Sequence, residues 1–313
     1  MSAKVIAFIN FKGGVGKSSN VVNIGACLAH LHRRRVLLVD LDAQCSTTYS
    51  LLRPTEFNAI DKKRDPEFPY RPHVTTYQIF HDSFRGTKSF EMESAIKRGV
   101  PYDKSRAELI PLLDLLPASI DLMRLEGGIA PHVFQYNIKP SLRKALEPLL
   151  NRYDYILIDC PPNIYYIAQA GIYAADYLVV PTNPDYLSIS AFNAFCELVK
   201  DKTDATTIVR SRFQGCPIAA VTINRYNRIG IAFDTAISEL YTKLYDLIDQ
   251  QVVHPQCIVL DPPIRTDVRM NETVSEHKPV ILHRPDSIGA VDYSMLTSAF
   301  IKHFEVTLHS PLL

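Results

Sequence analysis

Two lysines flank a short run of glycines near the start of the chain. Lys12 precedes the segment G-G-V-G, and Lys17 follows it. Glycine N–H groups can wrap around a phosphate, and a lysine directly after them can reach its outer oxygens. A serine hydroxyl at the next position is suited to bind Mg²⁺, so Ser18 is the expected metal ligand. The residues of this predicted phosphate-binding loop are Gly13, Gly14, Val15, Gly16, Lys17, Ser18 and Ser19.

The residues on either side of this loop have the patterns of a strand and a helix. Residues 5–9 form an apolar run, and Val21, Ile24 and Leu28 follow the loop at helical spacing. A strand that leads through a loop into a helix directs N–H groups and the helix dipole toward an anion. The usual pattern G-x-x-x-x-G-K-[ST] requires glycine at position 11, where this chain has Phe11. A simple glycine turn would not need two lysines and a serine in register.

Carboxylates occupy the ends of two other apolar runs. Asp159 follows residues 155–158, and Asp42 lies just beyond the run 36–39, which Asp40 closes. An acid at the carboxyl end of a buried parallel strand faces the crevice in which ligands bind. We therefore expect Asp159 to help hold Mg²⁺. Asp40 has two interpretations, because a strand-end carboxylate is equally suited to cap a helix.

Seven short apolar runs alternate with helical stripes along the chain. Most of the runs lack polar alternation, which is typical of parallel strands that are covered on both faces. Strands that alternate with helices predict an α/β fold, a doubly wound and mostly parallel sheet flanked by helices. We expect one domain over residues 1–313, with a proline-rich surface excursion at about 53–77. The seven runs are residues 5–9, 36–39, 112–116, 155–158, 178–180, 218–223 and 258–260.

The composition narrows the class of protein. About 47% of the residues are hydrophobic and 21% are charged, which suits a sizeable core. Neither a membrane-spanning run nor a signal-peptide pattern is found in the sequence, so a cytoplasmic location is expected. The six cysteines are scattered without a C-x-x-C pair, which argues against a metal or disulfide framework. Because the net charge is only +1, any surface that binds nucleic acid must be a local patch.

The string K-G-G-V-G-K-S has the form of the deviant Walker A motif, and the chain resembles the ParA/MinD group of P-loop ATPases, most of all its ParA (Soj-like) members. The resemblance implies ATP and Mg²⁺ as cofactors. It also implies that Lys17 binds the chain's own nucleotide, whereas Lys12 reaches the phosphates of a partner in an ATP-sandwich homodimer. Asp42 would position or deprotonate the attacking water and help hold the hydrated Mg²⁺. Lys12, Lys17 and Asp42 are therefore the expected catalytic residues.

Further segments extend the resemblance to most of the chain. The segment V-D-L-D-A-Q matches the family's V-D-x-D-P-Q, although Ala43 replaces the usual proline and Cys45 a usual glycine nearby, so the loop backbone could differ. By the same likeness Asn224 binds the adenine edge. Residues 262–265, which include Pro263, would close over the base.

For a ParA-type protein the resemblance implies that the ATP dimer binds DNA without sequence preference, on the nucleoid, and that a ParB-like or cargo adaptor protein stimulates hydrolysis. The cargo would be a plasmid, a chromosome region or a protein assembly. Each basic candidate for DNA binding could equally be ordinary solvated surface. The candidates are Arg210, Arg225, Arg228, Arg265 and Arg269, with Arg212 and Lys278 as further members.

Other functions of the same fold stay open. A MinD-like membrane ATPase would need a terminal amphipathic helix rich in Lys and Arg, whereas the final segment S-A-F-I-K-H-F-E-V-T-L-H-S-P-L-L has one lysine. No membrane partner is therefore expected. An ATP-dependent reductase or iron–sulfur carrier would need interfacial cysteine ligands, often in pairs, and the sequence has no such spacing. A metabolic ligase ranks lower still.

Overall fold

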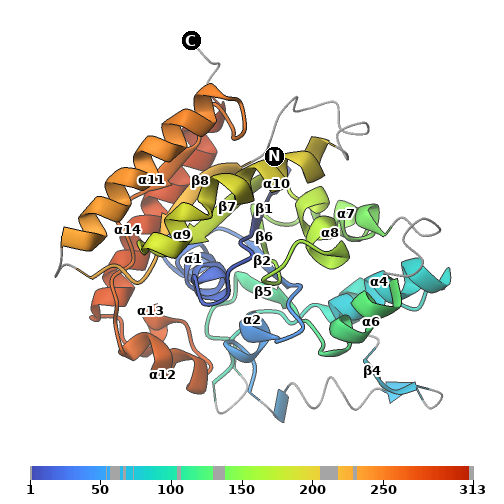
Figure 1. Cartoon of the computed structure of the whole chain (residues 1–313). Coiled ribbons are helices and arrows are strands. Elements are labelled where there is room, and N and C mark those ends of the chain that lie inside the picture. The colour runs from blue at the N-terminus through green and yellow to red at the C-terminus, as the bar shows by residue number, and fades with distance from the viewer. Residues whose placement is uncertain are drawn as a thin grey trace.

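The computed structural model describes residues 2–53, 55–56, 64–65, 68–72, 74–103, 107–129, 138–204, 218–227 and 231–309. Its centre is a seven-stranded sheet in the order β5-β2-β6-β1-β7-β8-β9, in which every pairing is parallel (Figure 1). Each strand coincides with one of the seven apolar runs to within two residues at either end, so the predicted α/β fold is confirmed. The strands are β1 (Lys4–Phe8), β2 (Val36–Asp40), β5 (Leu113–Leu116), β6 (Tyr155–Asp159), β7 (Tyr177–Thr182), β8 (Ile218–Ile223) and β9 (Ile258–Leu260).

Helices cover both faces of the sheet. On one face α1 (Lys17–His30) packs against α13 (Val280–His283) and α14 (Ile288–Ile301). On the other face α8 (Tyr166–Ala174) packs against α7 (Lys139–Leu146) and α10 (Phe192–Asp204). Figure 1 shows α11 and α14 along one side of the molecule and α4, α6 and α7 on the opposite side. The other helices are α2 (Ser46–Tyr49), α4 (Thr76–Arg85), α5 (Met92–Ala95), α6 (Asp121–Ile129), α9 (Tyr186–Ser190), α11 (Ile231–Asp249) and α12 (Arg269–Ser275).

Coverage on both faces explains why the strands are so uniformly apolar. Every residue of β2, β6, β7 and β8 is buried. Helix α1 approaches the sheet closely at Gly25, where a Cβ atom would lie 2.6 Å from Cδ2 of Leu38. The glycine loop lies between the end of β1 and the start of α1.

The predicted surface excursion at 53–77 differs from the structure at its C-terminal end. Residues 64–65 and 68–72 form a small antiparallel pair, β3 (Arg64–Asp65) and β4 (Phe68–Pro72), and much of the remaining excursion lies outside the described residues. Val74 to Tyr77 are buried, and the Thr76 hydroxyl donates to the Asp40 carbonyl oxygen at 2.9 Å. Residues 74–77 are therefore part of the buried interior rather than of a surface segment. Among the helices of the described residues, none is both long and apolar enough to cross a membrane.

Candidate nucleotide-binding site

The glycine loop joins β1 to the first turn of α1. Gly14 has φ +74° and Gly16, the residue before the helix, has φ +92°. These are left-handed conformations, which glycine adopts at little cost. A Cβ atom on Gly16 would also lie 2.8 Å from Cγ of Asn224. The loop therefore needs glycine at position 16 both for its backbone and for contact with the end of β8.

Lys17 reaches back across this loop. Its side chain is buried, and its Nζ donates to the carbonyl oxygen of Lys12 at 3.1 Å. Burial lowers the pKa of Lys17, while the nearby carboxylates of Asp159 and Asp42 counteract that shift. An ammonium group has three N–H donors, and within the described residues only this one hydrogen bond uses them. Two donors are therefore available to a ligand.

Two of the expected metal ligands, Asp159 and Ser18, lie beside Lys17. Asp159 is fully buried, with its Oδ2 accepting from the Thr47 hydroxyl at 2.8 Å and its Oδ1 without a hydrogen-bond partner in the described part of the chain. The Ser18 hydroxyl lies near enough to lower the pKa of Asp159, but burial outweighs it and raises that pKa. An unpartnered buried carboxylate oxygen next to a serine hydroxyl fits Mg²⁺, which typically takes one or two protein ligands beside nucleotide phosphates and water. Ser18 and Asp159 are thus together as the sequence predicts.

Asp40 and Asp42 have different surroundings. Asp40 is fully buried, and its Oδ2 accepts from the Thr48 backbone N–H and hydroxyl at 2.8 and 2.7 Å. Its Oδ1 accepts from the backbone N–H of Asp42 at 3.0 Å, so Asp40 has the capping role. The Asp42 carboxylate accepts only from the Gln44 backbone N–H, at 2.9 Å, among the described residues. Burial raises the pKa of Asp42, and the Lys17 charge partly offsets this.

Cys45, which stands where the family pattern has a glycine, adopts a left-handed backbone conformation. Its φ is +54°, in the left-handed region, and its side chain is buried. A non-glycine residue in that region costs about 1 kcal/mol. Burial raises the pKa of the Cys45 thiol, so the thiol stays protonated near neutral pH. The loop therefore accommodates the cysteine in a left-handed bend.

Asn224 lies directly after β8 and contacts the glycine loop. Its Nδ2 donates to the Val15 carbonyl oxygen at 2.9 Å, and its buried Oδ1 has no partner among the residues that the structure describes. The Ile264 N–H donates to the Ile223 carbonyl oxygen at 2.8 Å, which brings Pro263 beside the end of β8. An amide oxygen without a partner keeps its capacity to accept a hydrogen bond.

Two more buried polar groups lie next to Asn224 and were missed by the sequence reasoning. Thr182 ends β7, and its Oγ1 has no hydrogen-bond partner in the described residues; the same holds for Oδ1 of Asn183. The Asn224 N–H donates to the Thr182 carbonyl oxygen at 2.8 Å, so these groups share one corner of the site. The sequence signal that could have identified them is the change from apolar residues to Thr182 and Asn183 at the end of a strand.

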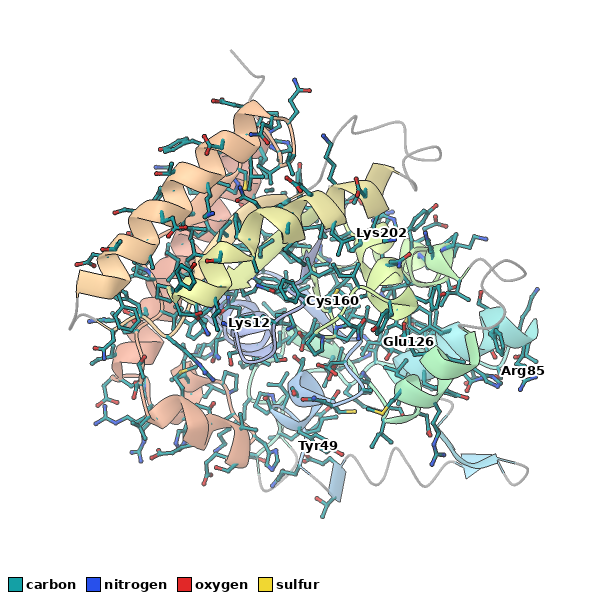
Figure 2. The ribbon with its side chains drawn as sticks, viewed as in Figure 1. Lys12, Tyr49, Arg85, Glu126, Cys160 and Lys202 are labelled. Carbon is teal, nitrogen blue, oxygen red and sulfur yellow. The ribbon has the colours of Figure 1, made fainter. Side chains whose placement is uncertain are left out.

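Lys12 is directed away from its own loop. Its Nζ lies 3.0 and 3.2 Å from the two carboxylate oxygens of Asp185 and 2.7 Å from the Ser188 hydroxyl. Asp185 caps α9, where it accepts from the Ser188 N–H at 2.9 Å. Figure 2 shows Lys12 near the centre of the molecule, close to the start of α1. The two lysines that flank the glycines therefore have separate partners.

The five basic candidates for DNA binding do not share one environment. Arg265 forms a two-pronged ion pair with Asp292 of α14, whose Oδ1 lies 2.6 Å from Nη2. Arg225 lies against Gly14 of the glycine loop, and Arg269 is exposed at the start of α12. Arg210 and Arg228 lie outside the described residues. The charge of Arg265 is thus already neutralised within the chain.

A glycine loop between the central strand and the first helix, with an acid at the end of the neighbouring strand, defines a P-loop NTPase fold. A family model described as "AAA domain" (AAA_31) matches residues 3–209, more than half of the chain. The chain belongs to this family and, within it, to the ParA/MinD group.

Relatives in this group match nearly the whole chain. "Sporulation initiation inhibitor protein Soj" of Bacillus subtilis is 28% identical over 93% of this chain and 95% of its own length. A "ParA family protein" of Chlamydia trachomatis is 27% identical over 95% and 97%.

Two solved structures show the same fold. A complex of a variant of Cyanothece McdA with ATP has a TM-score of 0.67 at 18% identity, over 100% of this chain and 99% of that one. Cobyrinic acid a,c-diamide synthase of Mycobacterium smegmatis, with a bound ATP analogue and magnesium, has a TM-score of 0.65 at 24% identity, over 99% of both chains.

Proposed function

We propose that one domain formed by the whole chain binds and hydrolyses ATP at this site. Backbone N–H groups of residues 13–19 would hold the phosphates, with Lys17 on the outer oxygens. Mg²⁺, when bound, neutralises phosphate charge, and Ser18, Asp42 and Asp159 would hold it directly or through water. Asp42 would orient the attacking water and accept its proton. Asn224 and Pro263 would contact adenine.

We further propose that ATP joins two copies of the chain. The observation that carries this proposal is the position of Lys12, whose ammonium group lies on the Asp185 side of the loop while Lys17 spans the loop itself. A triphosphate held by one lysine retains enough negative charge to attract a second cation from another subunit. Lys12 would exchange its contact with Asp185 for the partner's phosphates.

Single substitutions of Lys12 and of Asp185 distinguish the contact between these two residues from the proposed contact of Lys12 with the partner's phosphates. We expect Lys12→Ala to bind ATP but to remain monomeric and inactive, because the cation that crosses the interface is missing. Asp185→Asn keeps the α9 cap acceptor but weakens the hold on Lys12, so it should dimerise with ATP at a protein concentration up to about tenfold lower. Light scattering after size exclusion, with ATP or ADP, measures both effects. Lys144→Ala, an exposed lysine on α7, is the matched control. Normal dimerisation of Lys12→Ala would contradict the proposal.

The biological role that we propose is that of a ParA-type partition or positioning ATPase. Support comes from the near full-length similarity to Soj and to ParA family proteins. The ATP dimer would bind nucleoid DNA without sequence preference and carry a plasmid, chromosome region or protein cargo. A ParB-like or cargo adaptor would stimulate hydrolysis and release the dimer.

A DNA gel shift with ATP, ADP and no nucleotide tests this role. We expect retention of unrelated DNA sequences with ATP only, and a loss of at least about tenfold between roughly 50 and 200 mM salt, because phosphate contacts release counterions. Equal retention in all three nucleotide states would contradict it. Binding to anionic vesicles instead of DNA would favour the MinD-like alternative. Binding to neither would favour a metabolic enzyme of the same fold.

A further inference from the structure

Helix α11 carries two exposed aromatic rings on its outer side. Tyr241 and Tyr245 lie about one helical turn apart, and 38% and 65% of their surfaces are exposed. Side chains at this spacing on a helix are neighbours, so the two rings form one aromatic surface. Figure 1 shows α11 on the outside of the molecule. Tyrosine is enriched at protein interfaces, because its ring offers a large contact area and its hydroxyl offers a hydrogen bond.

A carboxylate lies at each end of this aromatic pair. Asp249 follows Tyr245 by about one helical turn and ends α11. Asp261 comes directly after β9, the strand at one edge of the sheet. Burial raises the pKa of the Tyr241 hydroxyl, and the charge of the nearby Asp261 carboxylate raises it further, which places Asp261 close to Tyr241. We call Tyr241, Tyr245, Asp249 and Asp261 the α11 surface.

The α11 surface lies in a strongly acidic part of a chain that is otherwise balanced in charge. The whole chain has 34 basic and 33 acidic residues, whereas residues 231–261 contain five acidic residues, one lysine and no arginine. That lysine, Lys243, already lies 3.5 Å from a carboxylate oxygen of Glu239. Asp249 and Asp261 are exposed, and neither forms an ion pair within the described residues. The rings are therefore bordered by negative charge that the described chain does not neutralise.

This combination of rings and carboxylates favours a cationic occupant. Nucleic acid and anionic lipid carry the same sign of charge as the surface, so both are repelled. A second copy of the chain that docked through the same surface would bring like charges together, which disfavours that contact. A guanidinium group, in contrast, stacks on aromatic faces and pairs with carboxylates through two parallel hydrogen bonds. Arginine is thus the side chain that matches both parts of the surface.

We propose that the α11 surface is a docking site for an arginine-rich segment of a partner protein. Guanidinium groups of that segment lie against the rings of Tyr241 and Tyr245, and the carboxylates of Asp249 and Asp261 pair with them at either end. The inference goes beyond the proposed nucleotide site and does not depend on it. Because the surface repels polyanions, it stays available to a protein partner when other parts of the chain bind phosphate groups.

Fluorescence anisotropy with a short labelled peptide of alternating arginine and serine tests the docking site. The double variant Tyr241→Ser/Tyr245→Ser should bind this peptide about tenfold more weakly, because it removes two exposed cation–π contacts. Asp249→Asn/Asp261→Asn should cost about fivefold, an effect that fades at high salt because exposed charges are screened. Tyr241→Phe/Tyr245→Phe keeps both rings and should match the wild type. Asp201→Asn, which neutralises an exposed acid of α10, is the matched control for charge.

Several results would overturn this inference. If the wild type does not bind the arginine peptide, or binds a glutamate–serine peptide equally well, the surface is not a cationic docking site. An equal loss in Asp201→Asn would show only general attraction to acidic surface. Displacement of the peptide by excess ADP and Mg²⁺ would place it in the nucleotide site instead. Self-association of the wild type that Tyr241→Ser/Tyr245→Ser abolishes would identify a second copy as the occupant. A chain that binds the peptide but no nucleotide would contradict the proposed function alone.

Discussion

Lys17→Ala is expected to lose about 100-fold or more in affinity for ATP and for ADP. Removing one partner of a desolvated charge pair typically costs 2–5 kcal/mol, or about 30-fold to 4,000-fold in binding. Lys17 is buried, and its positive charge faces both Asp159 and Asp42. Without it these carboxylates would repel the incoming phosphates. The loss should therefore exceed that of any other single substitution in the loop.

Fluorescent ATP and ADP analogues measure this effect at equilibrium. Lys12→Ala is the matched control, because it removes an equivalent ammonium group from the same loop but one that faces Asp185. Lys12→Ala should bind ADP with wild-type affinity. If Lys17→Ala retained nucleotide while it melted at the wild-type temperature, the assignment of the phosphate-binding loop would be wrong.

The sequence predicted the strands of the sheet well, because strands that helices cover on both faces consist almost entirely of apolar residues. The runs that became β2, β6, β7 and β8 have no polar residue directed toward solvent, since both of their faces lie under helices. The order of the strands does not follow from such runs. The insertion of β6 between β1 and β2 depends on how the chain crosses over the sheet. That insertion brings Asp159 level with Asp40 and next to the glycine loop.

Pairings between distant side chains were the part of the site that the sequence could not predict. Lys12 was identified from its spacing to the glycines, but its contact with Asp185 joins segments 173 residues apart. Arg265 and Arg225 look alike in the sequence as basic residues in the C-terminal half of the chain. In the structure one is neutralised by Asp292 and the other borders Gly14. Residue type indicates which charges exist, whereas the fold decides which of them already have partners.

We expect the Asp42 carboxylate to act on water rather than to support the fold. Its backbone N–H donates to Asp40, and its side chain accepts only from the Gln44 N–H in the described residues, so most of its acceptor capacity is not used within that part of the chain. Burial raises its pKa, which makes it a stronger base than a solvated aspartate. Because only the deprotonated form accepts a proton, the rate of hydrolysis should fall as the pH drops below that raised pKa.

Asp42→Ala is therefore expected to bind ATP and to accumulate as the ATP-bound dimer, with hydrolysis slowed about 100-fold to 10,000-fold, the usual contribution of a general base. Single-turnover assays measure the rate of hydrolysis, and light scattering measures the accumulation of the ATP-bound dimer. Asp42→Asn, which keeps the shape but not the charge, should behave in the same way and should lose the pH dependence. Asp40→Asn is the structural contrast, because Asp40 caps α2 and should affect the melting temperature first. Hydrolysis by Asp42→Ala at the wild-type rate would show that another group activates the water, and the raised pKa of Asp42 would then reflect only its burial between Lys17 and the loop.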